Sequence, residues 1–120
     1  MALVAETTVL IVDDHPAFRA SARRLLEREG YRVVGEAADG ESAVASAREL
    51  SPQLALVDVY LPDIDGFEVA SRLAALVPAP AIVLISSHDR PELAEPVSDS
   101  PAHGFLRKDE LSRSALEELL

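Results

Sequence analysis

Several apolar runs in this chain end at a residue with a charged or reactive side chain. Such runs are typical of buried parallel strands, whose carboxyl ends meet along one edge of a sheet. Open α/β sheets bind their ligands at that edge. The residues that the runs would place there are Asp13, Asp14, Asp58, Ser86 and Lys108. We therefore expect these side chains to share one crevice.

Three carboxylates in one crevice repel one another, by roughly 4 kcal/mol for each pair at ~4 Å and an effective dielectric of ~20. We therefore expect a cation among Asp13, Asp14 and Asp58. Oxygen ligands suit Mg²⁺, and the chain has no cysteine to provide thiolate ligands. An aspartate can attack phosphorus to form an acyl phosphate, and a lysine and a serine suit phosphate oxygens. The pattern predicts that Asp58 accepts a phosphoryl group, with Ser86 and Lys108 beside it.

Each of these residues also has an ordinary structural explanation. An Asp-Asp pair after a strand is more often a helix N-cap than a metal site, and Asp58 could cap a turn. Ser86 could simply end a strand, and Lys108 could be a solvated charge. The joint arrangement on four strand ends is far more specific than any single member.

The elements that must position these residues alternate between strand and helix. Strand patterns cover residues 8–12, 31–36, 54–57, 81–86 and 103–106. Helical patterns run from Pro16 to a C-cap at Gly30, over 42–50, and over 67–74, and a last helix follows Asp109. This alternation predicts an α/β fold of the flavodoxin-like type, a doubly wound five-stranded parallel sheet with strand order 2-1-3-4-5.

The fourth helix is the weak point of this pattern. Asp89 could cap it and Pro91 suits a first turn, but Pro96 in a helix interior would cost about 3 kcal/mol. We expect one or two helical turns at most between residues 87 and 102, followed by irregular chain to Pro101.

Three finer expectations concern the other helices. Leu50 should face inward at the end of the second helix, and Ala74 should belong to the apolar side of the third. Asp109 should cap the last helix. These expectations rest on local pattern alone.

Composition limits the classes of function. A chain of 120 residues supports one domain, and with 48% hydrophobic but only 4% aromatic residues its core must be aliphatic. The net charge of −10 makes direct nucleic-acid binding unfavourable. No apolar run approaches the ~20 residues of a membrane span, and the start lacks the basic region of a secretory signal, so we expect a cytoplasmic protein without membrane contact. The histidines are too scattered for a metal site and are expected on the surface or in loops: His15, His88 and His103.

Taken together, these motifs resemble the receiver domain of bacterial two-component response regulators, which has a CheY-like fold. The residues that carry the resemblance are Asp13-Asp14, Asp58, Leu61-Pro62, Asp65-Gly66, Ser86 and Lys108. The Asp-Asp-His-Pro motif at 13–16 and the Lys108-Asp109 pair resemble NarL-like receivers, which precede LuxR-type helix-turn-helix domains. The resemblance implies a single receiver domain over residues 1–120, without an effector or DNA-binding domain in the chain, and a role in transcription regulation.

The resemblance also implies roles for the acidic residues. Asp58 would be the phosphoacceptor, Asp14 a direct ligand of Mg²⁺ and Asp13 a ligand through water. The main-chain carbonyl of Tyr60 would complete the protein's share of the metal shell. Tyr60 and His88, two residues beyond Asp58 and Ser86, are expected to modulate the site, with the bulk of Tyr60 limiting the access of water.

A signalling cycle follows from the same resemblance. A sensor histidine kinase would supply the phosphoryl group, which Ser86 and Lys108 would bind while Phe105, in the place of the family's switch aromatic, turns inward. The face of the fourth helix, fifth strand and fifth helix would then meet an effector domain, a partner protein or a second copy. The domain would be a stoichiometric acceptor and not an enzyme.

Two alternatives remain open from the sequence. A phosphatase of the haloacid dehalogenase type also uses an aspartate nucleophile, but it needs a second aspartate two residues later, where this chain has Tyr60. A receiver that is never phosphorylated could act purely as a protein interaction module. The intact acceptor, acidic pair and lysine argue against that reading.

Overall fold

The structure, a computed structural model, describes residues 7–87 and 93–120. Five parallel strands form one sheet in the order β2-β1-β3-β4-β5. The strands are β1 (Thr8–Val12), β2 (Arg32–Ala37), β3 (Leu54–Asp58), β4 (Ala81–Ser86) and β5 (Gly104–Arg107). The helices are α1 (Pro16–Arg28), α2 (Gly40–Leu50), α3 (Gly66–Ala74), α4 (Ala94–Ser98) and α5 (Arg113–Leu119). The predicted flavodoxin-like fold and strand order are confirmed.

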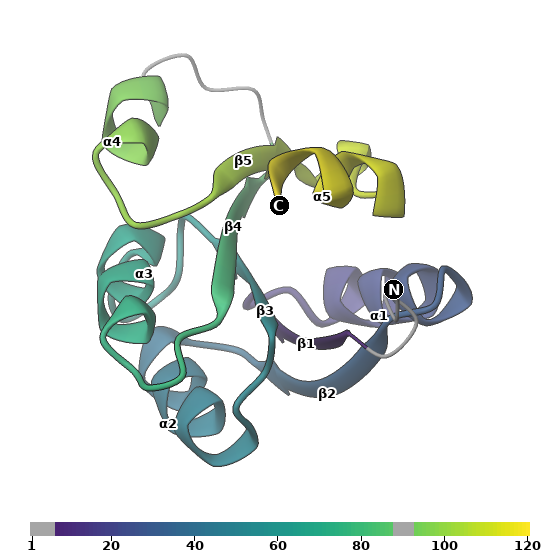
Figure 1. Ribbon diagram of the computed structural model, residues 1–120, viewed down its shortest axis with the longest axis horizontal. Helices are drawn as coiled ribbons and strands as arrows, with labels where there is room; N and C mark the ends of the chain where they lie inside the picture. Colours follow the sequence, from purple (N-terminus) through teal and green to yellow (C-terminus); the bar gives the residue numbers. More distant parts are fainter. Residues whose placement is uncertain (1–6, 88–92) are drawn as a thin grey trace.

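Helices cover both faces of the sheet, with α1 and α5 on one side and α2, α3 and α4 on the other (Figure 1). The three central strands are buried almost throughout, because both of their faces are covered. Alternate strand residues therefore enter two separate cores. Val9 and Ile11 pack on the α1–α5 side, whereas Leu10 and Val12 pack on the α2–α3 side. Both cores are largely aliphatic, as the composition predicts.

The second and third helices differ in detail from the expected pattern. Asp39 caps α2, accepting a hydrogen bond from Ser42 N at 2.8 Å, so the helix begins at Gly40 and not at residue 42. Leu50 is 39% exposed, because it lies at the last position of α2, near Gly35 at the edge of the sheet. Ala74 is exposed at the end of α3, and Val69 takes a buried place that the pattern did not assign.

The last helix begins later than predicted. Residues Lys108–Glu110 form a 3₁₀ turn, and Leu111 has extended backbone angles that end it. Ser112, not Asp109, caps α5 by accepting a hydrogen bond from Ala115 N at 3.0 Å. A second cap comes from far away in the sequence, because Glu29 Oε1 accepts from Arg113 N at 2.6 Å.

The fourth helix is a single turn, as expected. Pro96 is the third residue of the five-residue α4. The first turn of a helix needs no N–H donor at that place, so the proline is accommodated there and not in an interior. Asp89, Pro91 and His88 lie outside the described residues.

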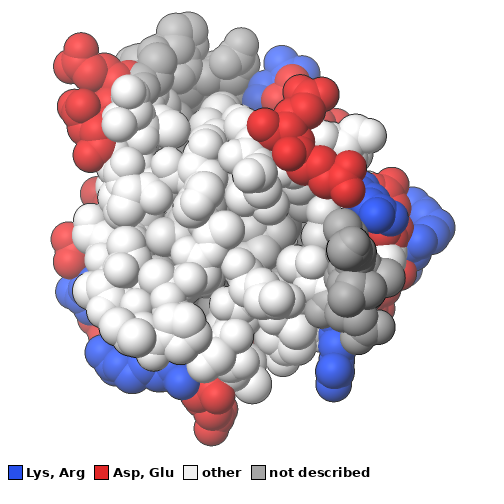
Figure 2. All heavy atoms as spheres, viewed as in Figure 1, with Lys and Arg blue, Asp and Glu red and all other residues white. Residues whose placement is uncertain are grey.

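Charged side chains lie mainly around the rim of the face seen in Figure 2, and uncharged residues occupy its centre. This face therefore presents no basic patch among its described residues that would suit nucleic-acid phosphates. Within residues 7–87 and 93–120, no helix has both the length and the apolar character needed to cross a membrane.

Candidate functional site

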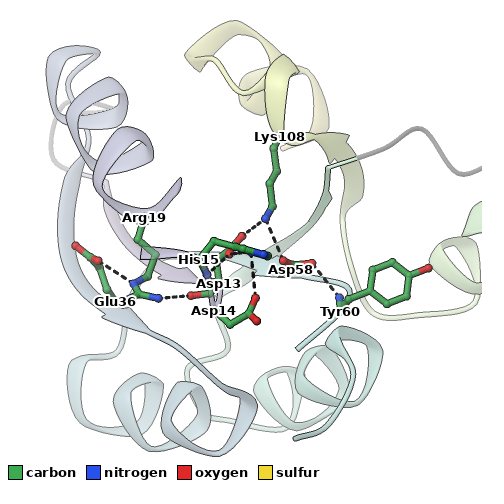
Figure 3. A network of polar contacts seen from close by, with 8 residues as sticks. All are labelled: Asp13, Asp14, His15, Arg19, Glu36, Asp58, Tyr60 and Lys108. Carbon is green, nitrogen blue, oxygen red and sulfur yellow. Dashed lines mark hydrogen bonds and ion pairs between the residues drawn. The ribbon is translucent and has the colours of Figure 1, made fainter. Parts of the chain in front are cut away.

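The carboxyl ends of four strands meet at one edge of the sheet, as the sequence predicts. Asp13 directly follows β1, Asp58 is the last residue of β3 and Ser86 is the last residue of β4. Lys108 follows β5 at the start of the 3₁₀ turn. Figure 3 shows the side chains of Asp13, Asp58 and Lys108 pointing toward one another.

The carboxylate of Asp58 lies between a backbone donor and an ammonium group. Its Oδ1 accepts a hydrogen bond from Tyr60 N at 2.9 Å, and its Oδ2 is 3.1 Å from Lys108 Nζ. The residue is only 3% exposed. Burial raises the pKa of Asp58 above its ordinary value, and the Tyr60 N–H and Lys108 offset part of that effect. The nearby Asp13 carboxylate raises this pKa further.

Asp13 is completely buried, yet only one of its oxygens is hydrogen-bonded. Its Oδ1 accepts from His15 N at 2.8 Å and lies 2.9 Å from His15 Nδ1. Its Oδ2 contacts Lys108 Nζ but accepts no hydrogen bond of standard geometry from the described residues. Asp14 is more exposed, and its Oδ1 is 3.1 Å from His15 Nδ1. A buried carboxylate oxygen without a full set of partners is the kind of atom that a bound cation satisfies.

Lys108 is the positive charge inside this cluster. It contacts both Asp13 and Asp58, and its Nζ lies 4.6 Å from the centroid of the Phe18 ring. Burial lowers the pKa of Lys108, but its ion-pair contacts with the two carboxylates outweigh this and raise the pKa above its ordinary value. The ammonium form is therefore maintained, and the aromatic face of Phe18 adds a cation–π contact.

The donor atoms of the cluster are close enough to share one cation. Ligand atoms from Asp13, Asp14, His15 and Asp58 all lie within 4.8 Å of one another. Three carboxylates form a hard oxygen donor set, which fits Mg²⁺ better than a softer metal. His15 is exposed, as expected, but its ring lies against both aspartates. Its position directly after the Asp-Asp pair was the only signal of this proximity in the sequence.

The other predicted residues surround this cluster at different depths. Ser86 is buried, and Phe105 is half-buried and packs against the α2–α3 core. The backbone of Tyr60 contacts Asp58, whereas the residue as a whole is 51% exposed and its ring points away from the carboxylates (Figure 3). In this arrangement the ring does not cover the acceptor. His103 is exposed and accepts a hydrogen bond from Ile82 N through Nδ1 at 3.2 Å, if that nitrogen is unprotonated.

Sequence reasoning missed two supports of the site. Arg19 donates hydrogen bonds to the main-chain carbonyl of Asp13 and to Glu36. Asp63, in the loop after β3, accepts hydrogen bonds from Gly40 N at 2.8 Å and from Glu41 N at 2.9 Å. These backbone donors lower the pKa of Asp63 to about 2. The carboxylate therefore fastens the loop that follows Asp58 to the start of α2, and no local pattern marks a contact of this kind.

Comparison with known proteins identifies the family. The model of the response regulator receiver domain matches residues 9–120 of this chain. A Pseudomonas aeruginosa protein described as a transcriptional regulator is 42% identical over 112 residues, which cover 93% of this chain and 52% of that protein. BvgA of Bordetella pertussis, described as a positive transcription regulator of virulence factors, is 42% identical over 103 residues, which cover 85% of this chain and 49% of BvgA. The chain thus spans about half the length of these relatives.

Solved structures agree with this assignment. The signal receiver domain of the response regulator NarL from Mycobacterium tuberculosis is 33% identical with a TM-score of 0.85, covering 95% of this chain and 96% of that one. A LuxR-family two-component response regulator from Aurantimonas sp. SI85-9A1 is 32% identical with a TM-score of 0.83, covering 93% of this chain and 84% of that one. The chain therefore belongs to the response regulator receiver domain family, among relatives of the NarL type.

Proposed function

We propose that this domain is a phosphorylation-controlled switch that accepts a phosphoryl group on Asp58 from a sensor histidine kinase, with Mg²⁺ as cofactor. The observation that supports this most strongly is the position of the Asp58 carboxylate. It ends β3, is almost fully buried, and has Lys108 Nζ at 3.1 Å with the Asp13 carboxylate beside it. A buried carboxylate held next to a fixed ammonium group is suited to a reaction that brings in more negative charge.

The reaction itself needs Asp58 in its ionised form. One carboxylate oxygen forms a bond to phosphorus while the P–N bond of the kinase's phosphohistidine breaks, and the imidazole nitrogen keeps the electron pair of that bond. Burial opposes ionisation of Asp58, and Lys108 together with the Tyr60 N–H favours it. The two groups hold the carboxylate in a single orientation, so that little reorganisation is needed when the donor arrives.

The surrounding side chains would share the charge of the phosphoryl group. Asp13, Asp14 and Asp58 would hold Mg²⁺, with the main-chain carbonyl of Tyr60 as a further ligand. When bound, the ion would offset the negative charge on the phosphoryl oxygens. Lys108, which now contacts the Asp58 carboxylate, would bind one of these oxygens, and the Ser86 hydroxyl would donate to another.

Phosphorylation would change the signalling state of the domain by shifting an equilibrium between two arrangements of the region around Ser86, Phe105 and α4. A phosphoryl group changes this equilibrium only if it is bound more tightly in one arrangement. An arrangement with Ser86 drawn toward the phosphoryl oxygens and Phe105 turned inward meets that condition. Phe105 is half-buried on β5 and lies close to the single turn of α4, so both can repack at modest cost. The face of α4, β5 and α5 would then bind an effector domain, a partner protein or a second copy, and so regulate transcription as in the named relatives.

Intact-mass spectrometry after incubation with acetyl phosphate and Mg²⁺ tests this proposal. We expect one phosphoryl adduct on the wild type, no adduct on Asp58→Asn, and a normal adduct on Asp99→Asn. Asp99 is an exposed carboxylate at the end of α4 and serves as the matched control. If neither the wild type nor the control gains an adduct, an unphosphorylated interaction module becomes the better description. Continuous turnover of phosphomonoesters would instead favour a phosphatase.

A further inference from the structure

Arg19 contacts the acidic cluster through the main chain of Asp13. Its Nη1 donates a hydrogen bond to the main-chain carbonyl of Asp13 at 2.5 Å, and its Nε donates to Glu36 Oε1 at 3.1 Å. The side chain is only 18% exposed although it lies on α1 among other arginines. Figure 3 shows the guanidinium between Glu36 and the backbone at Asp13.

The contact fixes the peptide group between Asp13 and Asp14. The N–H of Asp13 donates to Ala37 O at 3.0 Å, which continues the pairing of β1 with β2. The carbonyl of Asp13 lies beyond this pairing, and Arg19 is the donor that holds it. The orientation of this peptide group sets the direction in which Asp14 leaves the strand. Arg19 is therefore placed where it can set how the two carboxylates are aimed relative to each other.

Glu36 in turn fixes Arg19. It lies on the edge strand β2, and its second oxygen accepts from Arg23 Nε at 2.7 Å. Arg23 also donates to Glu27 Oε2 at 3.2 Å. The hydrogen bond from Arg23, together with that from Arg19, lowers the pKa of Glu36, so this anchor stays ionised at neutral pH. A guanidinium can bind Glu36 and the carbonyl of Asp13 at once because its donors form a rigid fork, which a lysine ammonium does not have.

We propose that Arg19 is a positioning residue for the cation site, and that Glu36 is its anchor. This inference rests on the Mg²⁺ site of the proposed function. The positioning role predicts a change in Mg²⁺ affinity that is opposite in sign to the change expected from simple electrostatics. Removing a positive charge near a cation site should tighten cation binding, because repulsion is relieved. Removing a group that aims the carboxylates should weaken binding, because Asp13 and Asp14 lose their common orientation.

Calorimetric titration of the folded domain with Mg²⁺ distinguishes these effects. We expect Arg19→Gln to bind Mg²⁺ about tenfold more weakly than the wild type, a loss typical of residues that orient metal ligands. Arg19→Lys keeps the charge but cannot span both acceptors, so it should also bind more weakly. Glu36→Gln should show a smaller loss in the same direction, but its lost negative charge also weakens cation binding, so the Arg19 variants carry the test. Arg24→Gln removes an exposed arginine from the same helix and is the matched control, with binding unchanged or slightly tighter.

The possible results separate this inference from the proposed function. If the wild type binds no Mg²⁺, the cation site itself is wrong. If the wild type binds and both Arg19 variants bind as tightly or more tightly, the positioning role alone is overturned. A purely structural role would lower the melting temperature but leave the dissociation constant unchanged at a temperature where every variant is folded. Should Arg19→Gln fail to fold, Arg19→Lys, which keeps the charge, still decides the question.

Discussion

The acceptor side of the site, at the ends of β1 and β3, is fixed from several directions, whereas the output side, around α4 and β5, is held more lightly. Asp58 and the loop after it are tied by the Tyr60 N–H, by Gly66 N donating to Val59 O at 2.8 Å, and by Asp63. On the output side, α4 has five residues and no side-chain cap at its start, and Phe105 is only half-buried. Chemistry needs one fixed geometry, and a readout needs two arrangements of similar free energy.

The same substitution in the two regions should give very different results. A Cβ at Gly66 would lie 2.4 Å from Asp58 O and 2.8 Å from Val59 Cα, which are backbone atoms that cannot move aside. We expect Gly66→Ala to lower the free energy of unfolding by about 3 kcal/mol. A Cβ at Gly104 would meet the Leu119 side chain, with Cδ2 at 2.5 Å, and this side chain can move. Gly104→Ala should cost less than ~1 kcal/mol, as measured by urea unfolding.

Equal losses of unfolding free energy in Gly66→Ala and Gly104→Ala would contradict the contrast between the two regions. A large loss in Gly104→Ala would mean that the β5–α5 packing is as rigid as the backbone contact at the acceptor. The unfolded-state gain from replacing glycine by alanine applies to both variants, so it does not affect the comparison.

A smaller effect should follow from releasing the loop that Asp63 fastens. Asp63→Ala leaves Gly40 N and Glu41 N without their acceptor, so their amide hydrogens should exchange roughly tenfold faster by NMR. Because the pKa of Asp63 falls from 3.8 to about 2 in the folded state, the carboxylate stabilises the fold fully above pH 3.8 and loses that effect as the pH falls toward 2.

The stability difference between wild type and Asp63→Ala should therefore narrow over that pH interval. Asp99→Ala, another exposed aspartate, is the control and should leave exchange at Gly40 and Glu41 unchanged. Unaltered exchange in Asp63→Ala would show that the loop is held by other contacts.

The smallest effect is expected on the output side. Pro96→Ala adds an N–H in the first turn of α4. First-turn N–H groups have no acceptor within the helix, so the new group forms no helical hydrogen bond and the free energy of unfolding should change by less than ~1 kcal/mol. In both forms, hydrogen exchange should be faster in α4 than in α3. Strong protection across Leu93–Val97 would contradict a lightly held output side.

Hydrophobic pattern predicted most of the fold and the centre of the site. Runs such as 8–12 and 54–57 gave the strands, and strand ends brought Asp13, Asp58 and Lys108 together. The pattern could not identify Arg19, because a guanidinium on the polar side of an amphipathic helix looks solvated until the position of β2 is known. Asp63 was missed for the same reason, since its partners start a helix more than twenty residues earlier.

The errors in the predicted helices have local causes. Asp109 has the right residue type for a cap, but the chain makes a 3₁₀ turn first and Ser112 takes that role. Leu50 and Ala74 fit the apolar period of their helices, but both stand at the last position of the helix and remain exposed. Period alone does not show where a helix runs past the core.

The bond from Arg113 N to Glu29 joins residues 84 positions apart. During synthesis on the ribosome, Glu29 emerges long before its partner exists. A helix of seven residues is far too short to persist alone in water, and Ser112 gives it only one cap. Helix α5 therefore docks only after Glu29 and the elements around it have folded, which makes its assembly a late step in the folding of the domain.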